Sequence, residues 1–440
     1  MALKFDYPSE MDLEKNRLLG IFEGASGRII FNLTSGAFLV GYLKYMGASD
    51  TVCGYILAIP VLAAGIQFLS PIILESLPYR KTIITIGTVI HRFLISALIL
   101  IPFIPISVRA KLWAVGIVFF ISYLAFSFVN PAISNMYVSF VPQNIRGKYF
   151  GMRESYILLA ATIVTLILGK ILDSFTSAGK ELIGYIVTYI IIFVFTLLNC
   201  SSYLLMKEVP LNHSKERIKI SEIFTLPFND KQFITYFIML ILWNVAYQIA
   251  NSFFSVYLKS DLNMSYTTIT LLTLVHSVIY VLTARKWGRF ADRKGWANTS
   301  MITIGILSIC HALWFFSSKE SPYILTFLIT AYIASGIAWS GINVALFNLQ
   351  FDFTPDEKRT VYIGLSAAAS GIIGFLAAVL GSQLVNIFGS NKIFLLGKPF
   401  DIKQILFLTS ALLLFLCALY IKFIMGPKQN NNNKEEINNA

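Results

Sequence analysis

The chain has 440 residues, of which 56% are hydrophobic and only 13% are charged. A soluble domain carries about a quarter charged residues, so this composition excludes an ordinary soluble protein. The net charge of +12 would suit a nucleic-acid binder, but most of the basic residues fall in alternate short loops, as membrane orientation requires. The sequence therefore predicts a polytopic α-helical membrane protein with no nucleic-acid partner.

Apolar runs long enough to cross a bilayer, at roughly 20 residues each, recur along the chain. We predict twelve spans, at 18–43, 50–74, 82–105, 111–140, 154–174, 183–206, 232–258, 265–285, 298–317, 322–351, 361–388 and 402–425. Lysine and arginine are concentrated in the segments that lie on the same side as the N-terminus. This asymmetry predicts both termini in the cytoplasm and an even number of spans.

The spans form two sets of six. We expect an N-terminal six-helix bundle, a cytoplasmic linker, a C-terminal six-helix bundle and a disordered cytoplasmic tail, at residues 1–206, 207–231, 232–426 and 427–440. The linker is basic, and its segment 218–226 is predicted to lie on the membrane surface as a short amphipathic helix. The tail is rich in asparagine and of low complexity.

One stretch of the chain occurs twice. Residues 122–151 and 335–364 align at an offset of 213 without a gap, and eleven of the thirty positions are identical, where average composition would give about two. Each copy is an apolar helix that ends at Phe-x-Pro, a short basic loop and a new apolar helix. The halves are therefore copies of one unit, a pattern typical of transporters whose site lies between the halves.

The loop after the eighth predicted span reads Gly-Arg-Phe-Ala-Asp-Arg-Lys-Gly at 288–295. With the duplicated six-helix halves, it resembles the G-x-x-x-D-R-x-G signature of the major facilitator superfamily, and the resemblance covers about residues 15–425. It implies a twelve-helix, two-bundle fold, alternating access, a small-molecule substrate and a monomer. It also implies a gate at Gly288, Asp292, Arg293 and Gly295, with Asp292 docked near the start of the fifth span. The alternative is a solvated turn.

The matching arginines of the repeat, Arg146 and Arg359, are assigned to the same gate. Among the carboxylates, Glu23 lies well inside a predicted span, where a charge is costly and usually functional or paired. We expect it to meet Arg92 or His91. Two interpretations stay open for Glu23, a structural pair or the site that carries a coupled proton.

The resemblance further implies that spans 1, 4, 7 and 10 line a central cavity. Arg28 offers a planar fork for a carboxylate or phosphate, and amides with aromatic rings on one face of span 7 suit polar solutes. The candidate substrate-binding residues are Arg28, Asn32, Asn130, Asn244, Tyr247, Gln248, Asn251, Trp339 and Asn343. The alternatives are an internal pair for Arg28 and interhelical hydrogen bonds, worth about 0.6 kcal/mol each, for the amides.

These features predict a secondary active transporter that moves a small polar organic solute, with protons as the coupling ion and Glu23 as their carrier. Two alternatives remain, a multidrug-type efflux antiporter and a non-transporting membrane sensor. No nucleophile–base or metal-ligand pattern recurs in the spans, so we expect no enzyme, cofactor or metal. The expected location is a bacterial-type plasma membrane, with the lipid bilayer as partner.

Overall fold

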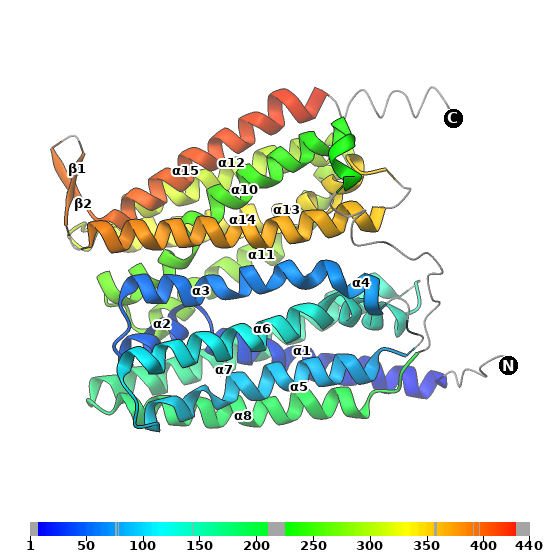
Figure 1. The fold of residues 1–440 in the computed structure, drawn as a ribbon, viewed down its shortest axis with the longest axis horizontal. Helices are drawn as coiled ribbons and strands as arrows, with labels where there is room; N and C mark the ends of the chain where they lie inside the picture. Colours follow the sequence, from blue (N-terminus) through cyan, green and yellow to red (C-terminus); the bar gives the residue numbers. More distant parts are fainter. Residues whose placement is uncertain are drawn as a thin grey trace. The chain divides into compact units, whose positions relative to one another are not determined.

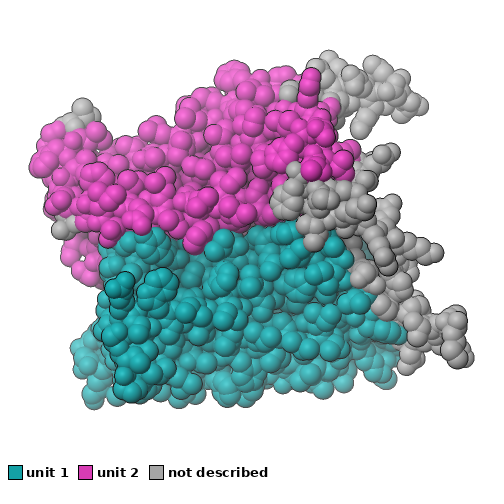
Figure 2. Space-filling view, in the orientation of Figure 1, with its two compact units in different colours: residues 1–218, 265–270 teal, residues 219–264, 271–440 magenta. Residues whose placement is uncertain are grey.

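The structure is a computed structural model that describes residues 8–74, 77, 79–143, 145–209, 225–355, 359–389, 391–395 and 397–427. The predicted tail from residue 428 and most of the predicted surface helix at 218–226 lie outside the described residues. The chain forms two compact units (Figure 2). Unit 1 is residues 1–218 with 265–270, and unit 2 is residues 219–264 with 271–440.

The helices of unit 1 lie alongside one another (Figure 1). They are α1 (Glu10–Leu33), α2 (Gly36–Tyr45), α3 (Asp50–Ala64), η1 (Gly65–Phe68), α4 (Leu69–Leu74), α5 (Lys81–Ala97), η2 (Leu98–Phe103), α6 (Val108–Ser139), α7 (Arg146–Ser177) and α8 (Glu181–Leu205). Serine hydroxyls at Ser9, Ser49 and Ser107 cap α1, α3 and α6 by accepting from the backbone N–H three residues later. α1 packs against both α7 and α8, and α5 packs against α6. These contacts place side chains of α7 and α8 against α1, and side chains of α6 against α5.

The start of α1 is tied to the end of α8. The side chain of Asn16, which is buried, donates to the carbonyl oxygen of Lys207 at 2.7 Å and accepts from its N–H at 2.9 Å. Asp12 pairs with the Lys207 ammonium at 3.0 Å. That ammonium, with the Ser9 hydroxyl, holds the pKa of Asp12 below its ordinary value. The first and last helices of the bundle are therefore joined by side-chain to backbone bonds as well as by packing.

Unit 2 contains a second set of long helices and one small hairpin (Figure 1). Its elements are η3 (Pro227–Asn229), α10 (Lys231–Val256), η4 (Tyr257–Asp261), α11 (Tyr266–Lys294), α12 (Trp296–Phe315), α13 (Ile324–Asp352), α14 (Arg359–Phe388), β1 (Ile393–Leu395), β2 (Lys398–Phe400), α15 (Ile402–Tyr420) and η5 (Ile421–Met425). The first five residues of α11, 266–270, belong to unit 1. The strands β1 and β2 pair antiparallel, with Phe394 opposite Pro399. α12 packs against α13 and α15, and α10 against α14 and α15.

Eleven helices of the described residues are long and apolar enough to cross a membrane. The first predicted span, 18–43, is instead divided, because α1 ends at Leu33 and α2 begins at Gly36. The hydroxyls of Thr34 and Ser35 bond back to the carbonyls of Ile30 and Phe31, at 2.7 and 2.6 Å, and Gly36 has a φ of +52°. Hydroxyls that bond back to the preceding turn bend helices, and a positive φ favours glycine, so the helix breaks here.

The internal repeat coincides with helix boundaries. α6 ends at Ser139 and α13 ends at Asp352, while α7 begins at Arg146 and α14 begins at Arg359. Both pairs are separated by the same 213 residues as the repeat. The two copies therefore adopt the same local structure, a helix end, a short connection and a helix start.

The predicted loop after the eighth span is mostly helical, which corrects the sequence-based boundary at 285. α11 continues to Lys294, and Gly295, with a φ of +81°, precedes α12. The extension is held in place because Trp287 donates to the carbonyl of Ile337 at 2.8 Å and Ala291 is buried. Of the signature, only Gly295 makes the turn.

Candidate functional site

A cavity of about 440 Å³ lies inside unit 1, among α1, α5, α6, α7 and α8. Three arginines and two glutamates line it, which leaves one positive charge in excess. The lining also contains one histidine, three tyrosines and an asparagine. The charged and polar residues are Arg28, Arg92, Arg153, Glu23, Glu154, His91, Tyr123, Tyr137, Tyr203, Asn130 and Ser134.

Glu23 of α1 is buried, with 7% of its surface exposed, and its carboxylate is surrounded by donors. Tyr137 and Tyr203 donate to its two oxygens at 2.5 and 3.0 Å. Asn199 donates to one oxygen at 3.3 Å, and Arg153 forms the ion pair at 3.3 Å. The ion partner is therefore Arg153, and the expectation of a direct pair with Arg92 or His91 was wrong. Donors on every side suit a charged carboxylate.

Glycines on α1 let the arginines approach the helix. A Cβ at Gly24 would lie 2.7 Å from Nη2 of Arg153, and a Cβ at Gly27 would lie 2.8 Å from Nη2 of Arg92. Gly24 follows Glu23 directly, and Gly27 lies about one helical turn beyond Glu23 on the same side of α1. The sequence E-G-A-S-G thus leaves room for two guanidinium groups beside a single buried carboxylate.

Arg92 of α5 is also buried, with 5% exposed. Its Nε donates to Asn199 at 3.2 Å, and its guanidinium lies 5.4 Å from the ring centroid of Phe126. In the described part of the chain no carboxylate oxygen lies within 4.0 Å of it. Asn199 links it to Glu23, since the same amide group donates to the Glu23 carboxylate. Arg92 is thus a buried cation that faces a cavity and has no ion-pair partner among the described residues.

Arg28 and Glu154 lie at the more exposed part of the cavity and pair at 3.1 Å, with 47% and 55% of their side chains exposed. Arg28 thus forms an internal pair, the alternative left open by the sequence, but with Glu154 rather than Glu23. Because an exposed pair of this kind contributes little to stability, its separation by a ligand costs little.

His91 lies beside Arg92 and is buried. Its Nδ1 is 2.6 Å from the hydroxyl of Ser122, and that hydroxyl donates to the carbonyl of His91 at 3.2 Å. Ser122 of α6 thus holds the imidazole of His91 in place at the cavity wall.

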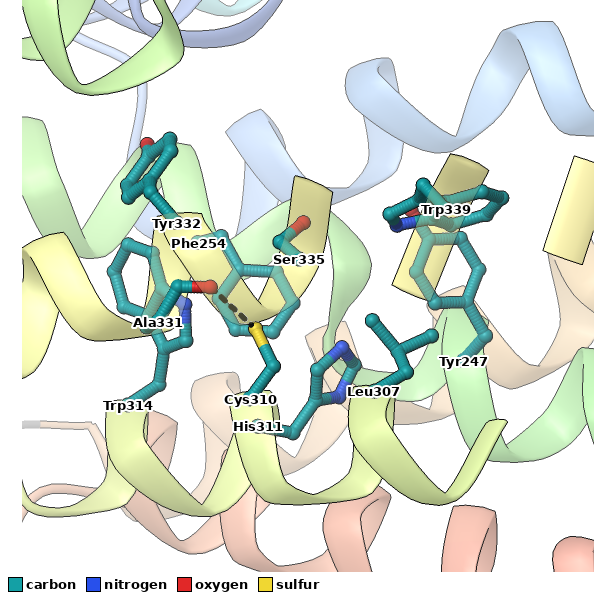
Figure 3. Close-up of a pocket in the computed structure, with 10 residues that line it drawn as sticks. All are labelled: Tyr247, Phe254, Leu307, Cys310, His311, Trp314, Ala331, Tyr332, Ser335 and Trp339. Carbon is teal, nitrogen blue, oxygen red and sulfur yellow. Dashed lines mark hydrogen bonds between the residues drawn. The ribbon is translucent and has the colours of Figure 1, made fainter. Parts of the chain in front are cut away.

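A second pocket, of about 130 Å³, lies inside unit 2 between α10, α12 and α13 (Figure 3). It contains two of the predicted substrate-binding residues, Tyr247 and Trp339. The remaining lining residues are Phe254, Leu307, Cys310, His311, Trp314, Ala331, Tyr332 and Ser335. Aromatic rings make up most of this pocket, whereas the cavity of unit 1 contains five charged side chains.

The other amides predicted to bind substrate make hydrogen bonds inside their own unit. Asn32 donates to Thr165 at 3.3 Å, and Asn343 donates to the hydroxyl of Tyr280 at 3.3 Å. Asn251 donates to Gln248 at 3.1 Å. Asn244 is buried and donates to the carbonyl of Leu240 at 2.8 Å. Of the nine predicted residues, Arg28 and Asn130 line the cavity of unit 1.

The predicted gate residues fall at helix ends. Arg146 donates to the carbonyl of Val141 at 3.3 Å, beyond the end of α6, and Arg359 lies 5.1 Å from the ring centroid of Phe351 near the end of α13. Asp292 and Arg293 are exposed on the last turn of α11, and Gly288 lies in that helix. These positions fit helix capping, and the gating role stays a prediction.

Sequence reasoning missed several of these residues. Arg153 and Glu154 were placed at the edge of the fifth span, but α7 begins eight residues earlier, so both lie within a helix. Asn199 and Tyr203 lie in an apolar run. Their spacing of four residues places them on one helix face, and this polar face was the signal that could have identified them. His311 carried a similar signal, a histidine within an apolar span. Within the described ranges, no three His, Cys, Asp or Glu side chains are grouped to hold a metal ion.

The family model described as Major Facilitator Superfamily matches residues 24–265 and 233–439. An uncharacterized MFS-type transporter of Methanocaldococcus jannaschii, MJ1560, is 24% identical over 283 residues, which are 63% of this chain and 69% of that protein.

Solved structures of transporters resemble the whole chain. The nucleoside transporter NupG has a TM-score of 0.67 at 15% identity, over 93% of this chain and 98% of NupG. The peptide transporter POT in complex with sulfate has a TM-score of 0.67 at 13% identity, over 96% and 95% of the two chains. The xylose transporter XylE from E. coli has a TM-score of 0.60 at 13% identity, over 93% and 95%. At such identities the likeness shows a shared fold.

Proposed function

Because the chain belongs to the major facilitator superfamily, we propose that it carries a small polar organic solute with an anionic group, by alternating access and together with a proton. The resemblance seen in the sequence is thereby confirmed, as is the all-α polytopic fold. The chain is an integral membrane protein and a transporter of this general kind, with a small-molecule substrate and a lipid surround. The substrate class and the coupled ion are the proposal.

One observation carries the substrate class. Arg92 is buried and lines the cavity of unit 1, and no carboxylate of the described residues lies within 4.0 Å of it. A buried arginine without an ion partner is costly in a membrane protein and usually serves function. Its planar fork matches a carboxylate or phosphate in two parallel hydrogen bonds. An anionic solute would supply the negative charge needed to pair with Arg92.

The polar groups around Arg92 complete such a site. Arg28 can exchange Glu154 for the solute, because that pair is about half exposed. Asn130 and Ser134 add hydrogen-bonding groups, and Tyr123 adds a ring with a hydroxyl. Amides and hydroxyls beside a cation suit a solute that carries hydroxyl or amide groups as well as its charge. The same positive excess would repel lipophilic cations, which counts against the efflux alternative.

Proton coupling follows from competition for Arg153. The Glu23 carboxylate is buried and depends on Arg153 as its ion partner. A solute anion that draws Arg153 or Arg92 toward itself leaves Glu23 buried with less positive charge nearby. Burial without a partner disfavours the charged form, so Glu23 takes up a proton. Solute and proton are then bound together, which is the basis of symport.

The rest of the proposal concerns the setting. The transporter acts as a monomer in a bacterial-type plasma membrane, with both termini in the cytoplasm. The distribution of lysine and arginine between alternate loops supports this orientation. The gate comprises Arg146 and Arg359, which occupy equivalent positions in the internal repeat, together with Gly288, Asp292, Arg293 and Gly295.

The test is the thermal stability of the purified full chain in detergent against a panel of solutes. The panel contains neutral sugars, sugar acids, sugar phosphates, amino acids, organic acids and lipophilic cations. A ligand at a hundred times its Kd stabilises the folded state by about 2.7 kcal/mol, which moves the midpoint measurably. We expect anionic solutes to raise the midpoint, and Arg92→Gln or Arg28→Ala to remove that rise.

The control is Arg109→Ala, because Arg109 is exposed at the start of α6 and lines none of the described pockets. It should keep the response to anions. A rise with lipophilic cations alone would reject the polar-solute proposal in favour of efflux. A response that survives both Arg92→Gln and Arg28→Ala would place the anion elsewhere.

A further inference from the structure

The pocket of unit 2 has the size and the walls of a ring-binding site. Its volume of about 130 Å³ is close to the roughly 150 Å³ that is enough to hold a benzene molecule in a protein interior. Figure 3 shows Leu307, Cys310, His311 and Trp314 in a row along α12, facing residues of the neighbouring helices. None of the ten lining residues carries a full charge when its histidine is neutral.

The walls present aromatic rings that are steeply inclined to one another. Tyr247 meets Trp339 edge to face, with ring centroids 5.1 Å apart. Phe254 lies 4.9 Å from Trp314 and 4.8 Å from His311, the latter again edge to face. Further rings, Trp243 and Phe407, stack behind Tyr247 and Phe254 at 5.5 and 4.6 Å. Rings held from behind in this way keep their orientation and offer both faces and edges to a planar guest.

His311 lines this mostly aromatic pocket, and the hydrogen-bonding role of its ring follows from its contact with Ser410. His311 is 2% exposed, and its Nδ1 lies 2.7 Å from the hydroxyl of Ser410. That hydroxyl donates its proton to the carbonyl of Ala246. Ser410 can therefore only accept from the imidazole, so Nδ1 carries the proton and Nε2 is an acceptor. No hydrogen bond to Nε2 is formed by the described residues.

We propose that this pocket binds an aromatic or heteroaromatic ring that bears a neutral N–H or O–H group, with that group donating to Nε2 of His311. A quaternary ammonium ion has no proton to donate, and no carboxylate lines the pocket to neutralise a cation. A purely apolar ring would leave the buried acceptor without a partner, at a cost in free energy. The chemistry of the pocket thus selects a ring with one donor over both.

This inference goes beyond the proposed function, because it concerns the other unit and a different ligand chemistry. It holds whether or not the cavity of unit 1 binds an anion. Its test uses uncharged probes, so that a failed response to anionic solutes and a failed response to ring compounds are separate results.

The experiment compares phenol with anisole, which differ by the donor proton and a methyl group, in binding to the purified full chain by titration calorimetry against a detergent blank. We expect phenol to bind about 2- to 10-fold more tightly, the factor for one hydrogen bond between neutral groups. Anisole is the more lipophilic of the two, so partition into detergent favours the opposite order. The preference for phenol should vanish in His311→Leu and persist in part in His311→Gln, which retains an acceptor.

Two further variants locate the site. Trp339→Ala removes a wall of the pocket and should weaken both probes alike. Arg109→Ala changes an exposed residue of unit 1 that lines neither pocket, and it should leave the preference for phenol unchanged.

Three results would overturn the proposal. They are equal affinities of phenol and anisole in the native chain, a preference for phenol that survives His311→Leu, and no binding of either probe. If His311→Leu does not fold, the comparison of the two probes in the native chain and in Trp339→Ala still decides the matter.

Discussion

Glu23 and Arg153 form an ion pair of 3.3 Å inside unit 1, although 130 residues separate them in the chain. The pair is not isolated, because the Arg153 guanidinium also lies 4.5 Å from the ring centroid of Tyr137, and Tyr137 donates to the same carboxylate. Asn199 and Tyr203 of α8 also donate to Glu23, so four helices meet at one carboxylate. A change in the charge of Glu23 therefore acts on α1, α6, α7 and α8 together.

Replacement of Glu23 by glutamine separates exchange from accumulation. The amide oxygen can still accept from Tyr137 or Tyr203, so the bundle keeps its packing, but glutamine cannot take up a proton. We expect Glu23→Gln to exchange solute across the membrane of proteoliposomes and to lose accumulation driven by a pH gradient. Counterflow of a labelled solute and pH-driven uptake, in the same vesicles, measure the two activities.

Glu320→Gln is the matched control, because Glu320 is exposed in a connection of unit 2. It should keep both activities. Uphill accumulation by Glu23→Gln at the native rate would remove Glu23 as the proton carrier and leave the structural interpretation of the pair.

Gly27 is predicted to set the position of Arg92. A Cβ there would lie 2.8 Å from Nη2 of Arg92 and 3.3 Å from Nδ2 of Asn199, so Gly27→Ala should displace the guanidinium from α1. If Arg92 binds the solute, the loss of a hydrogen bond to a charged group weakens affinity by about 10- to 100-fold. The solute concentration that half-saturates the rise in thermal midpoint measures this change.

The corresponding change at Gly116 is the comparison for Gly27. A Cβ at Gly116 of α6 would find only Cδ1 of Ile59, at 4.0 Å. Gly116→Ala should therefore bind the solute as the native chain does. Equal affinity in both variants would mean that Arg92 does not contact the solute.

The fold was predictable to a large extent, and the reason is local. Apolar runs bounded by charge, glycine or proline place most helices within a few residues, as at 402–425, where α15 and η5 together run from Ile402 to Met425. The errors occurred where the apolar run and the helix do not coincide. α7 begins at Arg146 and α11 ends at Lys294, so both helices extend through charged residues that read as loop.

The candidate site was predictable only in part, because its contacts join distant segments. The sequence identified Glu23, Arg28 and Arg92 as costly charges inside spans, and all three line one cavity. It did not predict which of them pair. Glu23 pairs with Arg153 of α7, and Arg28 pairs with the residue after Arg153, Glu154. Which side chains pair in this way depends on how the helices pack. His311 was missed because its role depends on Ser410, 99 residues away.

A buried ion pair at the start of α15 should stabilise unit 2. The ammonium of Lys403 is 2.6 and 2.8 Å from the two oxygens of Asp261, and Lys403 is 4% exposed. Removal of one partner from a buried pair leaves an uncompensated charge and costs about 3–5 kcal/mol. Lys403→Met should therefore lower the thermal midpoint by several degrees in detergent.

The double variant tests whether the cost at Lys403 comes from the charge left behind. Asp261→Leu in the Lys403→Met background removes that charge and should recover part of the lost stability. Purely additive losses would show that the two side chains act independently. Lys319→Met, at an exposed residue in a connection of unit 2, serves as the reference for loss of an ammonium group alone.

A close approach between the backbones of α14 and α10 predicts a large effect of a single methyl group. Gly381 of α14 faces α10 so closely that a Cβ would lie only 2.1 Å from the carbonyl oxygen of Ile249. A backbone atom cannot move aside as a flexible side chain can, so Gly381→Ala must separate the two helices. Overpacking of this kind costs about 1–3 kcal/mol or more. We expect a lower thermal midpoint and a lower yield of folded protein.

Gly305→Ala, in α12, adds the same methyl group where no atom lies within 4 Å, and alanine is favoured over glycine inside a helix by roughly 1 kcal/mol. It should match or exceed the native midpoint, and equal midpoints for the two variants would show that α10 and α14 are not in close contact at Gly381.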